Sequence, residues 1–341
     1  MDETKIPFDN NYLAFVRCLT YNHDAFIQEA LEGFAKQQTT FPFLCVVMDD
    51  CSTDATQTVI QEWMRAHCEQ DSLEYFNLEL TELYIAKHII NSNCTYAFYL
   101  LKQNLYRENE KKEKLIEPWV LHAKYEAICE GDDYWTSPNK LQEQVFFLEN
   151  HSEYSAVSTN ASVLKSPKVP MRLFGSNIKR DYRRLKEIIP KRKFHTASVV
   201  FRIAAMQKSP CYKQGDWDTF MWCCLITQGP IHYDGKVTCV YRKQQQGITE
   251  STPRIGWLKL ISKWADTLTD CFVPQYVPKK YVVRSVTRDI IRVYFDNRGK
   301  LSFEDRETIK TLYRHNFSWW NVFFDIKEVL ALFAKKYIRK G

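Results

Sequence analysis

Long hydrophobic runs, C-x-x-C cysteine pairs and internal repeats are all missing from this sequence. No apolar segment approaches the roughly 18 residues that a membrane-spanning helix needs. The first residues, MDETKIPF, are partly acidic and lack the apolar core of a signal peptide. We therefore expect a protein that is soluble or attached to a membrane only at its surface.

The 11 cysteines are an odd number without C-x-x-C spacing, which argues against a disulfide framework and against a zinc site. Cys18, Cys45, Cys129 and Cys239 lie inside apolar runs, where a reduced thiol behaves as a small hydrophobic side chain. Reduced thiols predict a cytoplasmic protein. Peripheral attachment to the inner face of the cell membrane stays open.

The charge of the chain is unevenly distributed. The net charge is +6, and residues 251–341 alone carry 18 Lys and Arg against 9 Asp and Glu. A second basic block, residues 165–208, contains 13 Lys and Arg but only two acids. Basic surface suits phosphate-bearing partners, either nucleic acid or anionic lipid. Charge alone does not choose between them.

Short β-rich runs alternate with amphipathic helical patterns through the first half of the chain. This alternation predicts an α/β fold with a mainly parallel sheet and crossover helices. The expected strands are residues 13–19, 43–48, 72–80, 125–129, 154–164 and 195–202, with a strand pair in 231–242. The expected helices are residues 24–37, 53–64, 138–150 and 216–228, and residues 107–118 are expected to be a solvated helix or loop.

The pattern becomes helical after Gly256, so we expect two domains, residues 1–250 and 251–341. The last segment has apolar residues at alternating spacings of four and three: Trp319, Phe323, Ile326, Leu330, Phe333 and Tyr337. Lysine and arginine follow at its end. Such an amphipathic helix either lies in a membrane interface or packs against the rest of the protein.

Two adjacent acids, Asp49 and Asp50, follow an apolar strand and precede a helix. Open α/β sheets bind ligands at this edge, and Asp50 is suited to accept a hydrogen bond from a nucleobase. Alternatively, the acids belong to an ordinary strand-to-helix turn in which Ser52 or Asp54 caps the helix. The sequence leaves both interpretations open.

A second acidic cluster, Glu130, Asp132 and Asp133, also follows an apolar strand, and Gly131 permits a tight backbone path. Carboxylates this close repel one another unless a cation or proton relieves them. Oxygen ligands of this kind select Mg²⁺ or Mn²⁺, usually shared with substrate phosphates. An acidic surface turn is the alternative, but two such clusters at successive strand ends favour a metal site.

Several ordered motifs resemble those of the family 2 glycosyltransferases with a GT-A fold. They are Thr20-Tyr21-Asn22, DDCSTD at residues 49–54, EGDDYW at 130–135 and SPNKLQEQ at 137–144. The resemblance covers roughly residues 11–248, and EGDDYW is similar to the motif of bacterial surface-polysaccharide members. It implies a GT-A catalytic domain, residues 1–250, followed by a helical, basic and amphipathic extension.

The resemblance also implies roles for single residues. Tyr21 would stack on the nucleobase and Asp50 would pair with it, with Thr20, Asn22 and Asp49 in the same nucleotide-sugar site. Asp132 and Asp133 match the metal-binding Asp-x-Asp region, with Asp133 the direct ligand of Mn²⁺ or Mg²⁺. Gly215-Asp216-Trp217 resembles the motif that supplies the catalytic base, which makes Asp216 the base and Asp218 the alternative.

The sequence departs from the family pattern at two places. Gly215 stands where many members have an acid, so the choice between Asp216 and Asp218 stays open. After Tyr241-Arg242 the family often has a His that helps to hold the metal or diphosphate, whereas this chain has Lys243 and Gln244. A Gln oxygen is a neutral and weaker ligand, and Arg242 or Lys243 can instead pair with the diphosphate.

Two tryptophans stand beside the acidic motifs. Trp135 and Trp217 can form a platform for the apolar face of an acceptor or donor sugar, or they can be core residues that follow a turn. His195 precedes Thr196 and Ser198 on the expected strand 195–202, and we assign it no catalytic role because a lone His is more often structural.

The sequence therefore predicts a metal-dependent, inverting glycosyltransferase. Its donor would be a nucleoside diphosphate sugar, preferably UDP-linked, and its acceptor a saccharide or lipid-linked saccharide of a surface polysaccharide. We expect no nucleic-acid partner. A nucleotidyltransferase is disfavoured because residues 19–24, LTYNHD, form no Gly-rich, basic loop for a triphosphate. A non-enzymatic module that binds anionic surfaces would leave the acidic clusters unexplained.

Overall fold

The computed structural model describes two compact units. Unit 1 comprises Met1–Asp181, Lys193–Lys208 and Gln228–Lys243, and unit 2 comprises Tyr182–Arg192, Ser209–Thr227 and Gln244–Gly341. The described residues are 6, 8, 12–108, 112–166, 168–175, 179–189, 192–209, 211–212, 214–215, 217–244 and 253–338, without the side chains of 113 and 335–338. Asp216 lies outside the described residues.

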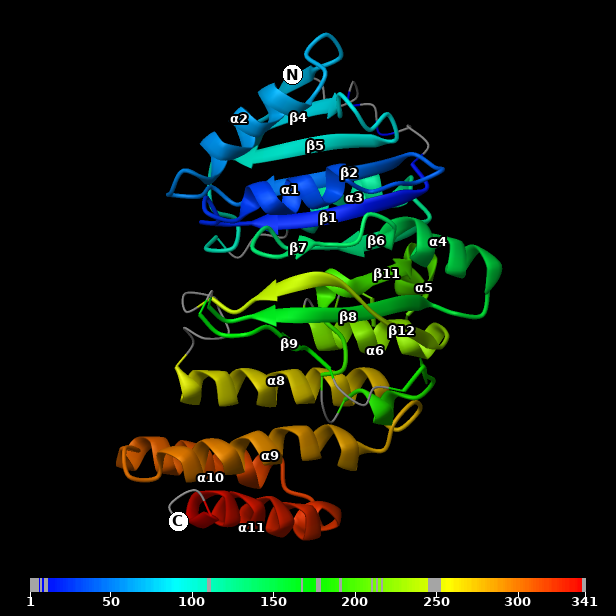
Figure 1. The fold of residues 1–341 in the computed structure, drawn as a ribbon. Coiled ribbons are helices and arrows are strands. Elements are labelled where there is room, and N and C mark those ends of the chain that lie inside the picture. The colour runs from blue at the N-terminus through cyan, green and yellow to red at the C-terminus, as the bar shows by residue number, and fades with distance from the viewer. Residues whose placement is uncertain are drawn as a thin grey trace. The chain divides into compact units, whose positions relative to one another are not determined.

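Unit 1 is built on one mixed sheet with the strand order β10-β12-β8-β11-β6-β1-β2-β5-β4-β3 (Figure 1). The strands are β1 (Ala14–Thr20), β2 (Phe43–Asp49), β3 (Glu74–Asn77), β4 (Thr81–Lys87), β5 (Cys94–Leu101), β6 (Tyr125–Ile128), β7 (Tyr134–Trp135), β8 (Ala156–Leu164), β9 (Arg172–Leu173), β10 (Asp181–Tyr182), β11 (Val199–Arg202) and β12 (Ile231–Arg242). The four central strands, β6, β1, β2 and β5, are parallel, which confirms the predicted parallel sheet, although no strand was predicted at β5. Antiparallel strands extend the sheet on both sides, at β11 and at β4 with β3.

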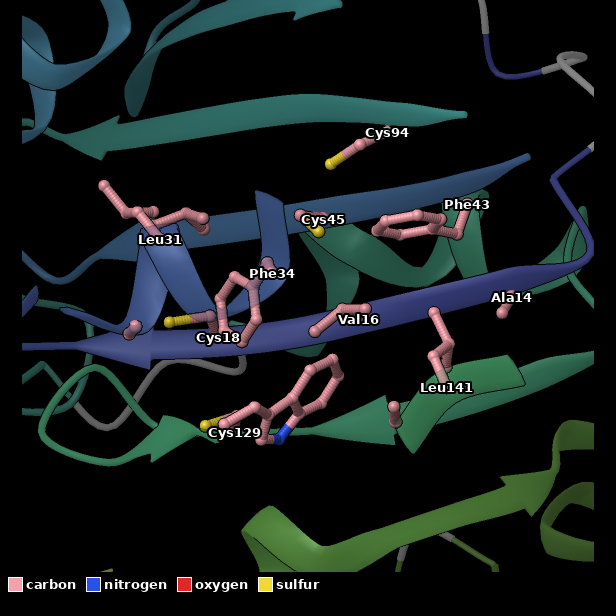
Figure 2. Packing of buried hydrophobic residues seen from close by; sticks show 14 of the residues in the cluster. Ala14, Val16, Cys18, Leu31, Phe34, Phe43, Cys45, Cys94, Cys129 and Leu141 are labelled. Carbon is pink, nitrogen blue, oxygen red and sulfur yellow. The ribbon is translucent and has the colours of Figure 1, made fainter. Parts of the chain in front are cut away.

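Helices cover both faces of the parallel strands. The helices of unit 1 are α1 (Ile27–Ala35), α2 (Thr56–His67), α3 (Glu113–Leu121), α4 (Lys140–Asn150) and α5 (Ile203–Lys208). Side chains of β1 and β2 alternate between the faces, so Val16 and Cys45 join the core under α1, α2 and α4, whereas Phe15 and Leu44 join the core with α3. Figure 2 shows Leu31 and Phe34 of α1 lying over β1 and β2. Burial of one such side chain stabilises the fold by roughly 1.5–3 kcal/mol.

Several segments of unit 1 differ from the secondary structure that their local sequence patterns predict. The expected strand at 72–80 is only β3, which pairs with β4. The charged stretch before Pro118 ends in α3, whose Trp119 is 2% exposed and donates a hydrogen bond to the Tyr99 hydroxyl at 2.8 Å. The expected strand at 195–202 begins with a 3-10 turn, Thr196–Ser198, and 231–242 is one strand, not a pair.

The cysteine prediction is confirmed for the core and wrong for one pair. Cys18, Cys45, Cys129 and Cys239 are buried free thiols, and burial raises the pKa of the Cys18 thiol well above its usual value. Cys211 and Cys271, however, form a disulfide within unit 2. Their 60-residue separation in the chain left no spacing signal for this pairing.

Unit 2 is helical and larger than the expected region 251–341. Its helices are α6 (Asp218–Gln228), α8 (Arg254–Phe272), α9 (Lys279–Asn297), α10 (Phe303–His315) and α11 (Val322–Ile338). Trp217 stacks on Trp264 with ring centroids 5.0 Å apart, and Phe220 contacts Phe272 at 5.7 Å. These contacts and the disulfide join residues 209–227 to the C-terminal helices. Among the described residues, no helix combines the length and the apolarity that crossing a bilayer requires.

Candidate functional site

Three loops meet at the carboxyl ends of parallel strands of unit 1. They are residues 21–24 after β1, 50–55 after β2 and 129–133 after β6, and we call them loops A, B and C. The register pairs Thr20 with Asp49 and Arg17 with Ile128, which brings the three strand ends to one edge of the sheet. Ligands of open α/β sheets bind at this edge.

Loops A and B are locked together by Asn22. Its backbone has φ +55°, a left-handed conformation that Asn tolerates better than most residues. Its side-chain oxygen accepts a hydrogen bond from Thr53 N at 2.8 Å, and its own N–H donates to Ser52 Oγ at 2.8 Å. Asn22 therefore shapes the site and leaves the neighbouring Tyr21 partly exposed.

Loop C lies directly against loop A. Gly131 N donates to the carbonyl of Leu19 at 2.9 Å, and a Cβ at residue 131 would lie 2.5 Å from Thr20 Oγ1. Only glycine permits this approach without displacement. Thr20 itself is 3% exposed, so its part in the site is to form this contact.

A partly exposed pair, His23 and Asp132, connects loops A and C. The nearest atoms, His23 Nε2 and Asp132 Oδ2, are 4.0 Å apart, and the side chains are 20% and 22% exposed. Burial lowers the pKa of His23 despite the opposing effect of Asp132. His23 was not among the predicted site residues, and its position directly after Tyr21-Asn22 is the sequence signal that could have marked it.

Asp133 points the other way, into the protein. Its side chain is 3% exposed, and Oδ1 accepts a hydrogen bond from Arg242 N at 2.9 Å. Burial, followed by the nearby charge of Asp132, raises the pKa of this carboxyl well above its usual value. His195 Nδ1 lies 3.7 Å from Asp133 Oδ2, so the histidine that received no catalytic role packs beside this acid.

Arg242, at the end of β12, contacts loop C. Its guanidinium donates to the carbonyl of Asp132 at 2.9 Å and pairs with Glu29 at 2.5 Å. The guanidinium carbon also lies 4.4 Å from the ring centroid of Tyr134. The residue is 8% exposed. These contacts fix the end of β12 to the acidic loop and occupy the donors that were expected to reach a diphosphate.

Asp49 and Asp50 are both buried and fully engaged. Asp49 accepts hydrogen bonds from Ser52 and from Gln57 Nε2, the latter at 2.7 Å, and burial raises its pKa. Its neighbour Asp54, not Ser52, accepts from Thr56 N at the start of α2. Asp49 therefore organises the turn, as the simpler sequence interpretation stated.

Asp50 anchors residues 105–112. Its carboxylate accepts from Leu105 N at 2.8 Å and Tyr106 N at 3.3 Å, and it pairs with Lys112 at 2.9 Å. In the same segment, Arg107 donates to the Tyr21 hydroxyl at 3.1 Å. Asp50 and Tyr21 therefore both contact residues 105–112, a segment for which the sequence predicted no part in the site.

The two tryptophans proposed as sugar platforms lie in packed environments. Trp135 is 4% exposed, donates to the carbonyl of Ala197 at 2.9 Å and contacts Phe34, so it presents no face to a sugar. Trp217 stacks on Trp264 in unit 2. The core interpretation fits Trp135, whereas Trp217 is half-buried with one ring face against Trp264.

The proposed bases belong to unit 2. Asp216 lies outside the described residues. Asp218 is the first residue of α6 and forms an ion pair with Arg192 at 2.5 Å, with 41% of its side chain exposed. The described residues of loops A, B and C belong to unit 1.

A divalent cation fits this site only in part. Among the described residues, no cluster of three His, Cys, Asp or Glu side chains could hold a metal ion. Asp132 offers a partly exposed carboxylate next to His23, and Glu130 of the same loop is also partly exposed. Magnesium and manganese are commonly held by one or two carboxylates together with substrate phosphates, and such a sparse protein site suits that arrangement.

Comparison with known proteins supports a family 2 glycosyltransferase. Residues 18–95, which contain loops A and B, match the family described as glycosyl transferase family 2. The uncharacterized proteins Rv1520 of Mycobacterium tuberculosis and Mb1547 of Mycobacterium bovis are 33% identical to this chain over 135 residues. That segment is 40% of this chain and spans only 31% of the length of either relative.

Solved structures confirm the expected GT-A fold. The crystal structure of residues 1–349 of TarS from S. aureus has a TM-score of 0.53 at 15% identity, covering 89% of this chain and 79% of that fragment. The same fragment in complex with UDP gives 0.52 at 14% identity with the same coverage. At this identity the likeness concerns the fold alone, including a helical region after the sheet.

Proposed function

We propose that this chain is an inverting glycosyltransferase that moves a sugar from a UDP-sugar to a hydroxyl of a saccharide or lipid-linked saccharide. The observation that carries the proposal is the convergence of loops A, B and C, with Tyr21, His23 and Asp132 accessible among them. This arrangement offers an aromatic face for a base beside a carboxylate for a metal-bound diphosphate. Surface-polysaccharide synthesis is the proposed context, on the EGDDYW motif.

Tyr21 and Arg107 form the proposed base site. A pyrimidine can stack on the Tyr21 ring, over which the Arg107 guanidinium lies 5.9 Å from the ring centroid. Asp50 holds residues 105–112 beside this ring. Direct pairing of Asp50 with the base stays a prediction, and it requires Lys112 or a backbone N–H to release the carboxylate. The UDP complex of TarS supports testing uridine nucleotides first.

Asp132 is the proposed ligand of Mn²⁺ or Mg²⁺. Its side chain is 22% exposed, whereas that of Asp133 is 3% exposed and bonded to Arg242. The cation, when bound, would neutralise the charge that builds on the departing diphosphate. Asp133 and Arg242 then hold loop C in place, and substitution of Gln244 for the expected metal-binding His stays a prediction.

The acceptor hydroxyl loses its proton to a carboxylate as it attacks the anomeric carbon opposite the diphosphate. A single displacement of this kind inverts the anomeric configuration. We propose Asp216 as this base. Asp218 is the alternative, although its ion pair with Arg192 already engages the carboxylate.

Nucleotide binding provides the first test. Thermal shift and calorimetry should compare UDP, GDP, CDP and ADP, each with and without Mn²⁺. We expect UDP with Mn²⁺ to raise the melting temperature most, since a ligand at 100 times its Kd stabilises a protein by about 2.7 kcal/mol. A panel of UDP- and GDP-sugars then reports donor hydrolysis or transfer.

The same panel separates the alternatives. A nucleotidyltransferase would respond to nucleoside triphosphates and release pyrophosphate. A module that binds anionic surfaces would show no nucleotide response. Either result, or Mn²⁺-independent binding of every nucleotide, contradicts the proposal.

A further inference from the structure

The last helix of unit 2 carries its apolar side chains outward. Trp319 in the preceding turn, η4 (Trp319–Asn321), is 82% exposed, and Phe323, Ile326 and Leu330 of α11 are 70%, 54% and 62% exposed. Their spacings of four, three and four place them along one side of the helix. We call these four residues the outer stripe.

The opposite side of α11 faces the other helices of unit 2 and is mixed, since Phe333, which was expected in the same stripe, contacts Phe295 of α9 with ring centroids 5.2 Å apart. Asp325 accepts hydrogen bonds from Thr287 of α9 and Tyr313 of α10, at 3.2 and 2.8 Å. Glu328 accepts from Arg292 of α9 at 2.6 Å. A helix on the surface of a water-soluble protein normally carries polar residues on its outer side. The outer side of α11 instead exposes the four apolar residues of the outer stripe, which suits an apolar environment.

The surroundings of the outer stripe are basic. Residues 316–341 carry five Lys and Arg against two acids, Asp325 and Glu328, and both acids are engaged within unit 2. Lys327 is exposed beside the stripe. On α9, Lys280 Nζ lies 4.6 Å from the Trp320 ring centroid, and the Arg284 guanidinium lies 3.7 Å from that of Phe324. Aromatic rings bordered by cations are typical of helices that lie in the headgroup region of anionic membranes.

We propose that the outer stripe docks on an anionic phospholipid bilayer, with α11 in the plane of the surface. The apolar rings enter the interface and the lysines contact lipid phosphates. A second copy of this chain is a poorer occupant, because two basic faces would repel each other. The proposal does not depend on sugar transfer, but under the proposed function it would bring the enzyme to a lipid-linked acceptor.

Vesicle flotation of the full chain tests this proposal. The vesicles contain phosphatidylcholine alone or with phosphatidylglycerol, and the test variant combines Trp319→Ser, Phe323→Ser and Leu330→Ser. The matched control combines Ile90→Ser, Leu121→Ser and Phe146→Ser, which are 88%, 64% and 64% exposed on unit 1. We expect the wild type and the control to float with anionic vesicles, and the stripe variant to bind about tenfold less. Added salt should weaken the binding of the wild type.

Two outcomes would overturn the proposal. One is that the stripe variant floats with anionic vesicles as well as the wild type does, or that neither protein floats. The other is a concentration-dependent dimer in sedimentation that the stripe variant loses, which would make a second copy the occupant. Far-UV circular dichroism and the UDP response are measured on the same samples. A folded stripe variant that still responds to UDP separates failure here from failure of the proposed function.

Discussion

Gly131 sets the distance between loop C and the end of β1. We predict that Gly131→Ala lowers the free energy of unfolding by about 1–3 kcal/mol, because the new Cβ would lie 2.5 Å from Thr20 Oγ1 and 2.7 Å from Thr20 Cβ. UDP binding should weaken with it. Gly299→Ala is the matched control, since its Cβ would meet no atom within 4 Å. Equal urea midpoints for both variants would contradict the packing argument.

Asp132 and Asp133 are neighbours with opposite surroundings. We predict that Asp132→Ala weakens Mn²⁺-dependent UDP binding at least about tenfold while leaving the melting temperature of the nucleotide-free protein unchanged. Asp133→Asn should retain binding, because an amide oxygen can accept the hydrogen bond from Arg242 N. Asp133→Ala should instead destabilise the protein by about 1–3 kcal/mol. Calorimetry that shows metal dependence lost in Asp133→Asn and kept in Asp132→Ala would restore Asp133 as the direct ligand.

At the scale of single elements, the turn between β4 and β5 carries a pH-sensitive group. His88 Nδ1 accepts hydrogen bonds from Ile90 N at 3.2 Å and Asn91 N at 3.0 Å. Burial lowers the pKa of His88, and the nearby His67 lowers it further. At pH values near and below the ordinary His pKa of about 6.5, the folded protein therefore binds fewer protons at His88 than the unfolded chain does.

The stability that His88 contributes depends on pH. We predict that the contribution of His88 to stability is complete above about pH 6.5 and falls as the pH drops from there toward the lowered folded-state pKa. Urea unfolding between about pH 5 and pH 7 should therefore show a smaller loss of stability in His88→Asn than in the wild type. His122→Asn, at an exposed position, is the control. An unchanged slope in His88→Asn would contradict the assignment.

At the scale of the whole molecule, the proposed donor site and the proposed base belong to different units. Tyr21, Asp50 and Asp132 are in unit 1, whereas residues 209–227 are in unit 2. Substitution of the base should therefore separate transfer from donor binding.

We predict that Asp216→Asn lowers transfer by about 100-fold or more and leaves the Kd for UDP with Mn²⁺ nearly unchanged. Asp218→Asn, which removes the carboxylate that pairs with Arg192, is the matched variant and should keep most of the activity. Calorimetry and donor turnover on the same preparations provide both readouts. If Asp218→Asn loses transfer and Asp216→Asn keeps it, the roles are exchanged.

Most of the central sheet and the meeting of loops A, B and C could be predicted because their signals are local. The apolar runs at 13–19, 43–48 and 125–129 are confirmed as β1, β2 and β6, and polar loops follow each of them. Parallel strands bring such loops to one edge whatever the rest of the chain does. By contrast, α3 looked solvated because its charged residues dominate the local composition, and only Tyr99 shows where Trp119 packs.

The sequence alone determined the class of fold and which loops follow the central strands, since strand and turn signals depend on near neighbours. Only the tertiary structure decided how the side chains within those loops are used. Asp133 turns inward because Arg242, 109 residues later, donates to it, and Asp132 is left accessible beside His23. Trp135 is a core residue because Phe34 and Ala197 cover it. Partners so distant in the chain leave no local pattern, so packing had to assign these roles.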